Sequence, residues 1–195
     1  MHQFAVAARV TALLVATAVC FGLVAPAGAA YAPVEPYANY QPQTGCSPVA
    51  KPGTTLLGHW IVRNYGGGFG PISRACAGRG VSEHKEGRAF DWTLSATNAA
   101  DRSRAARFLQ RVFAAGPDGE PAELARRMGI MYVIWNDRIY PAYDQFQVKP
   151  YLSSSCRSLA KCTRTLRHRD HLHVSLTRDG GWGRTSWYVG PTARN

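Results

Sequence analysis

Two short segments of the chain contain the residue types that bind a catalytic zinc ion. His84 and Asp91 are seven residues apart in the first segment, and His171 and His173 flank Leu172 in the second. A catalytic zinc takes three protein ligands from neutral imidazole and carboxylate groups and keeps a fourth position for water. Two histidines and one aspartate meet this requirement. The sequence therefore predicts a site for one zinc ion and a hydrolytic reaction.

The first segment is expected to fold as a loop followed by a strand. Gly87 allows the chain to turn, and residues 89–94 have the apolar and aromatic composition of a strand. This arrangement would place Asp91 near the metal that His84 reaches from the preceding loop.

The second segment has the alternating pattern of a strand over residues 171–176. Its two histidines would project to the same face, so that either of them could be the ligand while the other lies beside it. Asp170 precedes the strand and is close enough to act as a general base. His168 is a candidate for a substrate-facing or outer-shell group.

The two segments resemble the metal motifs of a known superfamily. Residues 82–91 (Ser-Glu-His-Lys-Glu-Gly-Arg-Ala-Phe-Asp) are similar to the Ser-x-His-x-x-Gly-x-Ala-x-Asp motif of the D-Ala-D-Ala metallopeptidases, and residues 170–173 (Asp-His-Leu-His) are similar to their second motif. The superfamily includes lysostaphin-type endopeptidases and the hedgehog signalling domain. The resemblance is closest to uncharacterised secreted actinobacterial members and extends from about Cys46 to Gly190.

This resemblance implies a role for each candidate residue. The zinc ligands would be His84, Asp91 and His173. Asp170 would be the general base, and His171 would be a neighbour that stabilises the transition state.

The resemblance is incomplete in the substrate-binding part. The characterised carboxypeptidases polarise the substrate carbonyl with an arginine in a Gly-Tyr-Arg-Ser-like segment, and this chain has no such segment. Arg74 is the nearest candidate for this substrate-binding role, and Arg79 is a second one.

Residues 1–30 have the features of a secretory signal peptide. They contain one cation, Arg9, then an apolar run over residues 10–24 and an Ala-x-Ala type cleavage site. The apolar run is too short to cross a bilayer comfortably, so we expect a secreted protein, extracellular or bound to the cell wall, with no transmembrane segment in the mature chain. Lipid attachment at Cys20 is the alternative, which the bulky Val19 disfavours.

Four cysteines follow the leader: Cys46, Cys76, Cys156 and Cys162. An even number in an oxidising compartment predicts two disulfides. Three pairings are possible, and we favour the first cysteine with the second and the third with the fourth, because the last two would close a short loop. A cysteine zinc site is disfavoured, since the closely paired spacing of such sites is absent.

The remaining chain is expected to contain a linker and one domain. Residues 31–45 are rich in Pro, Tyr and Gln, as is typical of an extended linker, and residues 46–195 are enough for a single core. The expected fold class is α+β, a small antiparallel sheet that carries the zinc site, with helices packed on one face. Apolar periodicity predicts helices over 54–64, 98–115 and 121–128, and strands over 89–94, 130–135, 138–140 and 171–176.

The chain of 195 residues has a net charge of +11, which favours an anionic partner. Peptidoglycan or another anionic polymer of the cell envelope would qualify. A solvated basic surface that aids solubility is the alternative. Nucleic acid is not expected, because aromatic residues are not interleaved with the basic ones and no phosphate-cradling loop is present. The sequence leaves the oligomeric state open.

Together these features predict a secreted zinc peptidase that acts on peptidoglycan peptides, the substrate nearest to an exported protein. A non-catalytic, zinc-stabilised module for wall binding or signalling is the alternative. A secreted nuclease is a third hypothesis, which the absence of a phosphate-binding loop disfavours. The scissile bond is not predicted.

Overall fold

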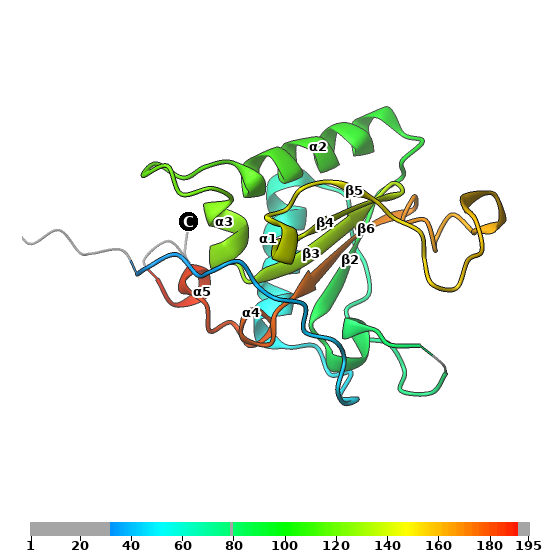
Figure 1. Cartoon of the computed structure of the whole chain (residues 1–195), viewed down its shortest axis with the longest axis horizontal. Coiled ribbons are helices and arrows are strands. Elements are labelled where there is room, and N and C mark those ends of the chain that lie inside the picture. Colours follow the sequence, from blue (N-terminus) through cyan, green and yellow to red (C-terminus); the bar gives the residue numbers. More distant parts are fainter. Residues whose placement is uncertain (1–31, 79, 191–195) are drawn as a thin grey trace, which may run out of the picture. The chain divides into compact units, whose positions relative to one another are not determined.

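The computed structural model describes residues 32–78 and 80–190, and the predicted leader, with Cys20, lies outside them. The described chain forms an α+β fold around a six-stranded antiparallel sheet with strand order β1-β2-β6-β3-β4-β5 (Figure 1). The strands are β1 (Gly68–Phe69), β2 (Ala89–Thr93), β3 (Ile130–Trp135), β4 (Arg138–Pro141), β5 (Lys149–Pro150) and β6 (His171–Leu176). The four predicted strands are confirmed, and the two-residue strands β1 and β5 were not predicted.

Five α-helices and three short 3₁₀ helices accompany the sheet in the described residues. They are α1 (Pro52–Tyr65), α2 (Ala99–Phe113), α3 (Glu123–Arg127), α4 (Arg178–Trp182), α5 (Ser186–Val189), η1 (Glu83–Glu86), η2 (Ala142–Asp144) and η3 (Leu159–Lys161). The three predicted helices are confirmed as α1, α2 and α3. The third begins at Glu123 and not at Pro121, because Ala122 has a left-handed backbone (φ 50°) that cannot continue a helix.

Local signals explain where the two long helices begin and end. Pro52 occupies the first turn of α1, and Gly66 ends the helix with a φ of 78°. The side chain of Asn98 caps α2 by accepting a hydrogen bond from the amide of Asp101.

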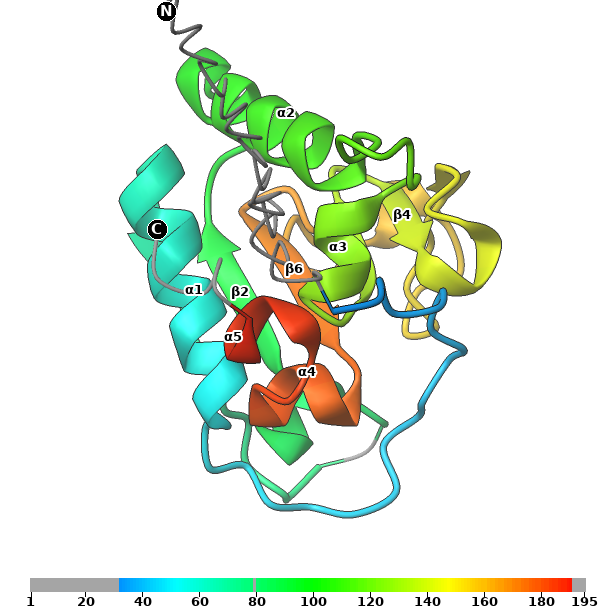
Figure 2. The same ribbon diagram turned by 90° about the vertical axis from the view of Figure 1, so that its left-hand side faces the viewer.

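The sheet has one apolar face and one polar face. The apolar face packs against the helices, with α1 behind the sheet in Figure 1 and α2 along its upper edge (Figures 1 and 2). Its buried side chains are Phe90, Trp92, Val133, Leu172, Val174 and Leu176. Because side chains alternate along a strand, the residues between them, among them Asp91 and His173, face the other side.

The register of the central strands brings two predicted ligands together. In the antiparallel pair β2 and β6, Asp91 is the direct partner of His173. On the other side of β6, Ile134 of β3 also pairs with His173. The site therefore rests on strands that have a partner on both sides.

The N-terminal segment (residues 32–44) contains no helix or strand but is bound to the domain, and the described residues form one compact unit. The carboxylate of Glu35 accepts hydrogen bonds from the amide (2.5 Å) and the hydroxyl (2.8 Å) of Ser186. Arg126 donates to the carbonyl of Glu35, and Arg88 donates to that of Gln41. The predicted linker thus lies against the domain that it precedes.

The predicted disulfide pairing is confirmed. Cys46 is bonded to Cys76, and Cys156 to Cys162. Two disulfides fit an extracellular protein, because they persist in oxidising compartments. Among the described residues, no helix has the length and apolar character needed to span a membrane.

Candidate metal centre

Three side chains from three elements converge on the polar face of the sheet. His84 comes from η1, Asp91 from β2 and His173 from β6, and all three are buried. The distances are 3.1 Å from His84 Nε2 to Asp91 Oδ1, 2.9 Å from His173 Nδ1 to Asp91 Oδ1, and 3.2 Å between the two nitrogens. The structure thus brings together the three predicted ligands as a group that could hold a metal ion.

The turn at Gly87 connects the first two of these residues. Gly87 has a left-handed backbone (φ 67°), and a Cβ atom at this position would lie 1.9 Å from the carbonyl oxygen of Val49. Only glycine fits here, because it has no Cβ and adopts positive φ at little cost. This tight turn lets His84 and Asp91 reach the same point from η1 and β2.

Hydrogen bonds to the outer ring nitrogens indicate the tautomer of each histidine. His84 Nδ1 lies 2.8 Å from the carbonyl oxygen of Ile72, which can only accept a hydrogen bond. The proton is therefore on Nδ1, and the lone pair of Nε2 faces the cluster. A backbone carbonyl on the outer nitrogen is a common partner of a metal-bound histidine.

The ring nitrogen of His173 that faces away from the cluster begins a chain of hydrogen-bonded side chains that was not predicted from the sequence. This nitrogen, Nε2, lies 2.9 Å from Ser175 Oγ, which lies 3.4 Å from Oε2 of the buried Glu83. Tyr132 donates to the same carboxylate oxygen at 2.5 Å. This chain places the proton of His173 on Nε2 and leaves Nδ1 as a lone pair toward Asp91.

Three electron pairs therefore point at one small volume. Burial acts to raise the pKa of Asp91, but the adjacent imidazoles of His173 and His84 outweigh it and hold this pKa well below its usual range, so that the carboxylate is ionised. Burial lowers the pKa of His173, which favours the neutral, metal-binding form. Converging lone pairs repel one another unless a cation lies between them, and this donor set fits one.

The size of the triangle also fits zinc. Bonds of about 2.05 Å in a tetrahedral site separate the ligand atoms by roughly 3.3 Å. The three distances among His84, Asp91 and His173, 2.9 to 3.2 Å, are slightly smaller. Two imidazoles and one carboxylate are the ligands of many catalytic zinc sites, which keep one position for water.

Asp170 and His171 form a pair at the edge of this cluster. His171 Nδ1 donates to Asp170 Oδ1 at 2.7 Å, and Thr165 donates to the other carboxylate oxygen at 2.6 Å. Burial acts to raise the pKa of Asp170, but these hydrogen bonds lower it overall, so that the carboxylate stays ionised. His171 Nε2 lies 3.6 Å from Asp91 Oδ1. His171 thus faces the cluster directly, and Asp170 contacts it through His171.

The two candidate substrate-binding residues occupy different places. The ring of His168 lies 4.8 Å from that of His171 and 5.5 Å from that of His173, measured between centroids. Arg74 is exposed, and its amide donates to the carbonyl oxygen of His84. The structure thus brings His168 to the cluster and places the backbone of Arg74 beside it. Arg79 lies outside the described residues.

His168 has an unusual environment. Its backbone is left-handed (φ 49°), and its buried Nδ1 has no hydrogen-bond partner among the described residues. Burial, with the neighbouring histidines, lowers the pKa of His168 to about 2, so that the ring is neutral at physiological pH.

Comparison with known proteins gives one finding. A family model described as VldE, C-terminal domain, matches residues 46–155, more than half of the chain, and includes His84 and Asp91. No curated protein and no solved structure matches.

The resemblance to the D-Ala-D-Ala metallopeptidase, lysostaphin and hedgehog superfamily, with secreted actinobacterial members as its closest part, was therefore wrong, because the family model that matches is a different one. Two short motifs specify which atoms could bind a metal. They contain too few residues to specify the ancestry of the remaining chain.

Proposed function

The chain belongs to the family of the VldE C-terminal domain, and we propose that within this family it is a secreted, zinc-dependent peptidase that hydrolyses amide bonds of peptidoglycan peptides. The observation that carries the proposal is the convergence of the ligand atoms of His84, Asp91 and His173 at mutual distances of 2.9 to 3.2 Å. The histidine ring nitrogens that face away from the cluster are both held by hydrogen bonds.

A zinc ion held by these three residues would supply a Lewis acid for the scissile carbonyl and would lower the pKa of a bound water. The chain itself supplies the proton transfer. Asp170 accepts the Nδ1 proton of His171 in a hydrogen bond and so directs the lone pair of His171 Nε2 toward the cluster. The sequence predicted Asp170 as the general base, but Asp170 reaches the cluster only through His171. We therefore assign this role to His171, which would take the proton that the attacking water loses and deliver it to the leaving amine.

Two further observations support a substrate outside the cell. The disulfides fit an extracellular protein. The net charge of +11 attracts anionic polymers, of which the bacterial envelope has several.

The test is incubation of the zinc-loaded protein with intact peptidoglycan and defined muropeptides, followed by mass spectrometry. We expect peptide fragments that a chelator abolishes and added zinc restores. If zinc-loaded protein releases no fragment from any of these substrates, the peptidase proposal is wrong.

A second candidate function, a non-catalytic zinc-stabilised module for wall binding or signalling, has one observation in its favour. His171 Nε2 lies only 3.6 Å from Asp91 Oδ1, so a small movement would make it a fourth ligand. Four protein ligands are typical of structural zinc sites, which leave no position for water. X-ray absorption spectroscopy of the zinc protein separates the two functions by counting the histidines bound.

A further inference from the structure

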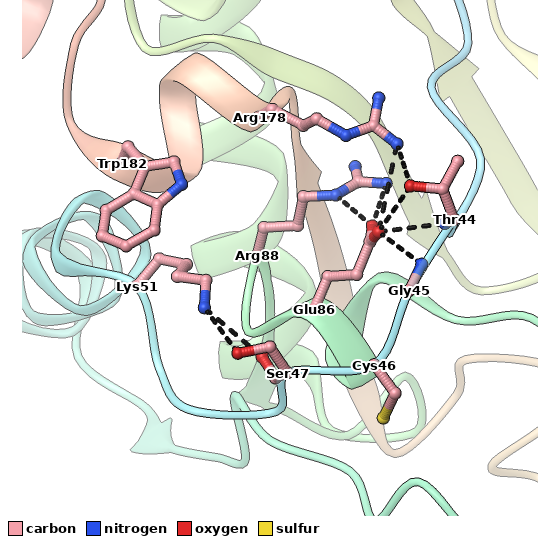
Figure 3. A pocket seen from close by; sticks show the side chains of 9 residues that line it. All are labelled: Thr44, Gly45, Cys46, Ser47, Lys51, Glu86, Arg88, Arg178 and Trp182. Atoms are coloured by element: carbon pink, nitrogen blue, oxygen red, sulfur yellow. Dashed lines mark hydrogen bonds and ion pairs between the residues drawn. The ribbon is translucent and has the colours of Figure 1, made fainter.

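A polar cavity, called the η1 cavity below, lies beside η1, between Lys51 at the start of α1, helix α4 and residues 44–47. Its volume is about 360 Å³, and Figure 3 shows its side chains. Glu86 faces this cavity, whereas His84 of the same short helix belongs to the metal cluster and Glu83 contacts Ser175 behind it. The cavity is therefore a separate site from the candidate metal centre.

Glu86, the acidic residue among those that line the cavity, is already satisfied by other groups. Its carboxylate accepts hydrogen bonds from the amides of Thr44 (3.0 Å) and Gly45 (3.3 Å) and from Nε of Arg88 (2.8 Å). Burial acts to raise the pKa of Glu86, but these bonds lower it overall. Arg88 is occupied as well, since it also donates to the carbonyls of Gln41 and Leu176. Glu86 and Arg88 thus form an ion pair of 2.7 Å, and Arg88 also lies 3.9 Å from Glu83.

Lys51 and Arg178 leave the cavity with a positive charge. The carboxylate oxygen of Glu86 is 3.9 Å from Arg178, too far for a hydrogen bond. Neutral groups hold Arg178 in place, namely the carbonyl of Pro42 (2.9 Å) and the hydroxyl of Thr44 (3.1 Å).

Lys51 is fixed on the opposite wall. Its ammonium group lies 3.2 Å from the hydroxyl of Ser47 and 5.0 Å from the centre of the Trp182 ring. Trp182 is 48% exposed and forms a flat apolar wall of the cavity. The first turn of α1, which begins beside Lys51, contains no acidic residue that would offset its positive end.

We propose that this cavity binds a sugar that carries an anionic group, either a phosphate or a carboxylate. The anionic group would lie between Lys51 and Arg178, and the sugar ring would pack against Trp182. Charges of one sign in a concave site concentrate the electrostatic potential. Hydrogen bonds from arginine and lysine to phosphate or carboxylate are among the strongest that proteins make. The site does not depend on the zinc centre or on the proposed peptidase activity.

Isothermal titration calorimetry of the full chain tests this assignment with four probes: inorganic phosphate, glucose 1-phosphate, glucuronate and glucose. We expect one of the two charged sugars, glucose 1-phosphate or glucuronate, to bind at least about tenfold more tightly than glucose. Which of the two binds shows whether the site prefers a phosphate or a carboxylate. A chelator should leave the affinity unchanged, because the metal cluster is not involved. Glucose that binds as well as both charged sugars, or binding that a chelator abolishes, would overturn the proposal.

Variants locate the binding. Arg178→Gln and Lys51→Gln should each weaken the preferred sugar about tenfold, as expected for a charged hydrogen bond. Arg184→Gln is the matched control, since it removes the same charge from the other cation near Trp182 (5.6 Å), which does not line the cavity. Trp182→Ala should reduce the affinity for the sugar to that for the free anion. Equal effects of the Arg178, Lys51 and Arg184 variants would show general surface attraction and refute the assignment.

Discussion

The candidate site has two parts whose side chains are held differently: the floor, formed by His84, Asp91 and His173, and the rim, formed by His168, Asp170 and His171. In the floor, each imidazole has both nitrogens in contact with a polar partner. In the rim, the side chain of Asp170 is 37% exposed, and the buried Nδ1 of His168 has no partner among the described residues. The side chains of the floor are thus held by polar partners, whereas the rim keeps hydrogen-bonding capacity that a substrate could use.

The largest expected effect is the loss of a floor ligand. His84→Ala or His173→Ala should weaken zinc binding by more than the ~10–100-fold that an outer-shell partner contributes, and abolish amide hydrolysis. Competition with a chromophoric chelator measures the affinity. His59→Ala is the control, because His59 is exposed on α1 and contacts Phe69. Zinc affinity that stays unchanged in both ligand variants would contradict the metal centre.

A change in the rim should separate turnover from metal binding. Asp170→Asn weakens the hydrogen bond that orients His171, so we expect zinc to stay bound while the turnover number falls by roughly 10²–10⁴-fold. Steady-state kinetics on a muropeptide, with zinc content measured in parallel, tests this. Full turnover in the variant would remove Asp170 from the reaction, and loss of zinc would assign the pair to the metal site.

Substitution of Glu83, which supports His173 through Ser175, should have a smaller effect on zinc binding. Glu83→Gln replaces the carboxylate that Ser175 and Tyr132 contact, and zinc affinity should fall about 10–100-fold. Glu86→Gln on the same helix is the matched control, since Glu86 faces the η1 cavity and not the metal cluster. A Glu83 variant that binds zinc as tightly as the Glu86 variant would show that the chain from His173 to Glu83 is only structural.

The smallest expected effect is on stability, and it concerns the ion pair of Arg167 and Asp137. Arg167 directly precedes His168 of the rim. Arg167 donates two hydrogen bonds of 2.8 Å to Asp137, which lowers the pKa of this carboxyl below its usual range. A carboxylate with a lowered pKa stabilises the folded state above its unfolded pKa, about 3.9, and loses that contribution as the pH falls through its folded pKa. The wild type should therefore melt above Asp137→Asn at pH 6, and the difference should shrink below about pH 4. Thermal melts from pH 2 to 7 measure it, and a constant difference would contradict the ion pair.

Much of the floor could be predicted because its signals are local. The spacing of His84 and Asp91 around Gly87 indicated two ligands, and the alternation through His171 and His173 indicated the face of the strand. The alternation left His171 and His173 as equal candidates, and only the resemblance of the motifs selected His173. The same alternation reaches Ser175, so the partner of His173 could also have been found.

The remaining contacts join residues that are far apart in the chain and have no local pattern. Glu83 meets Ser175 across 92 positions, and Glu35 meets Ser186 across 151. For this reason the composition of residues 31–45 predicted only a linker. The strands β1 and β5 were missed because two residues are too few to show a period.

The short helix η1 serves two sites within four residues. Glu83 and His84 belong to the metal centre, and Glu86 accepts a hydrogen bond from the N-terminal segment beside the η1 cavity. A residue inserted or deleted within η1 would rotate its side chains relative to one another. Either Glu83 and His84 or Glu86 would then lose their partners. We therefore expect natural length variation in this protein to avoid residues 83–86 and to occur in exposed loops such as the one that Cys156 and Cys162 close.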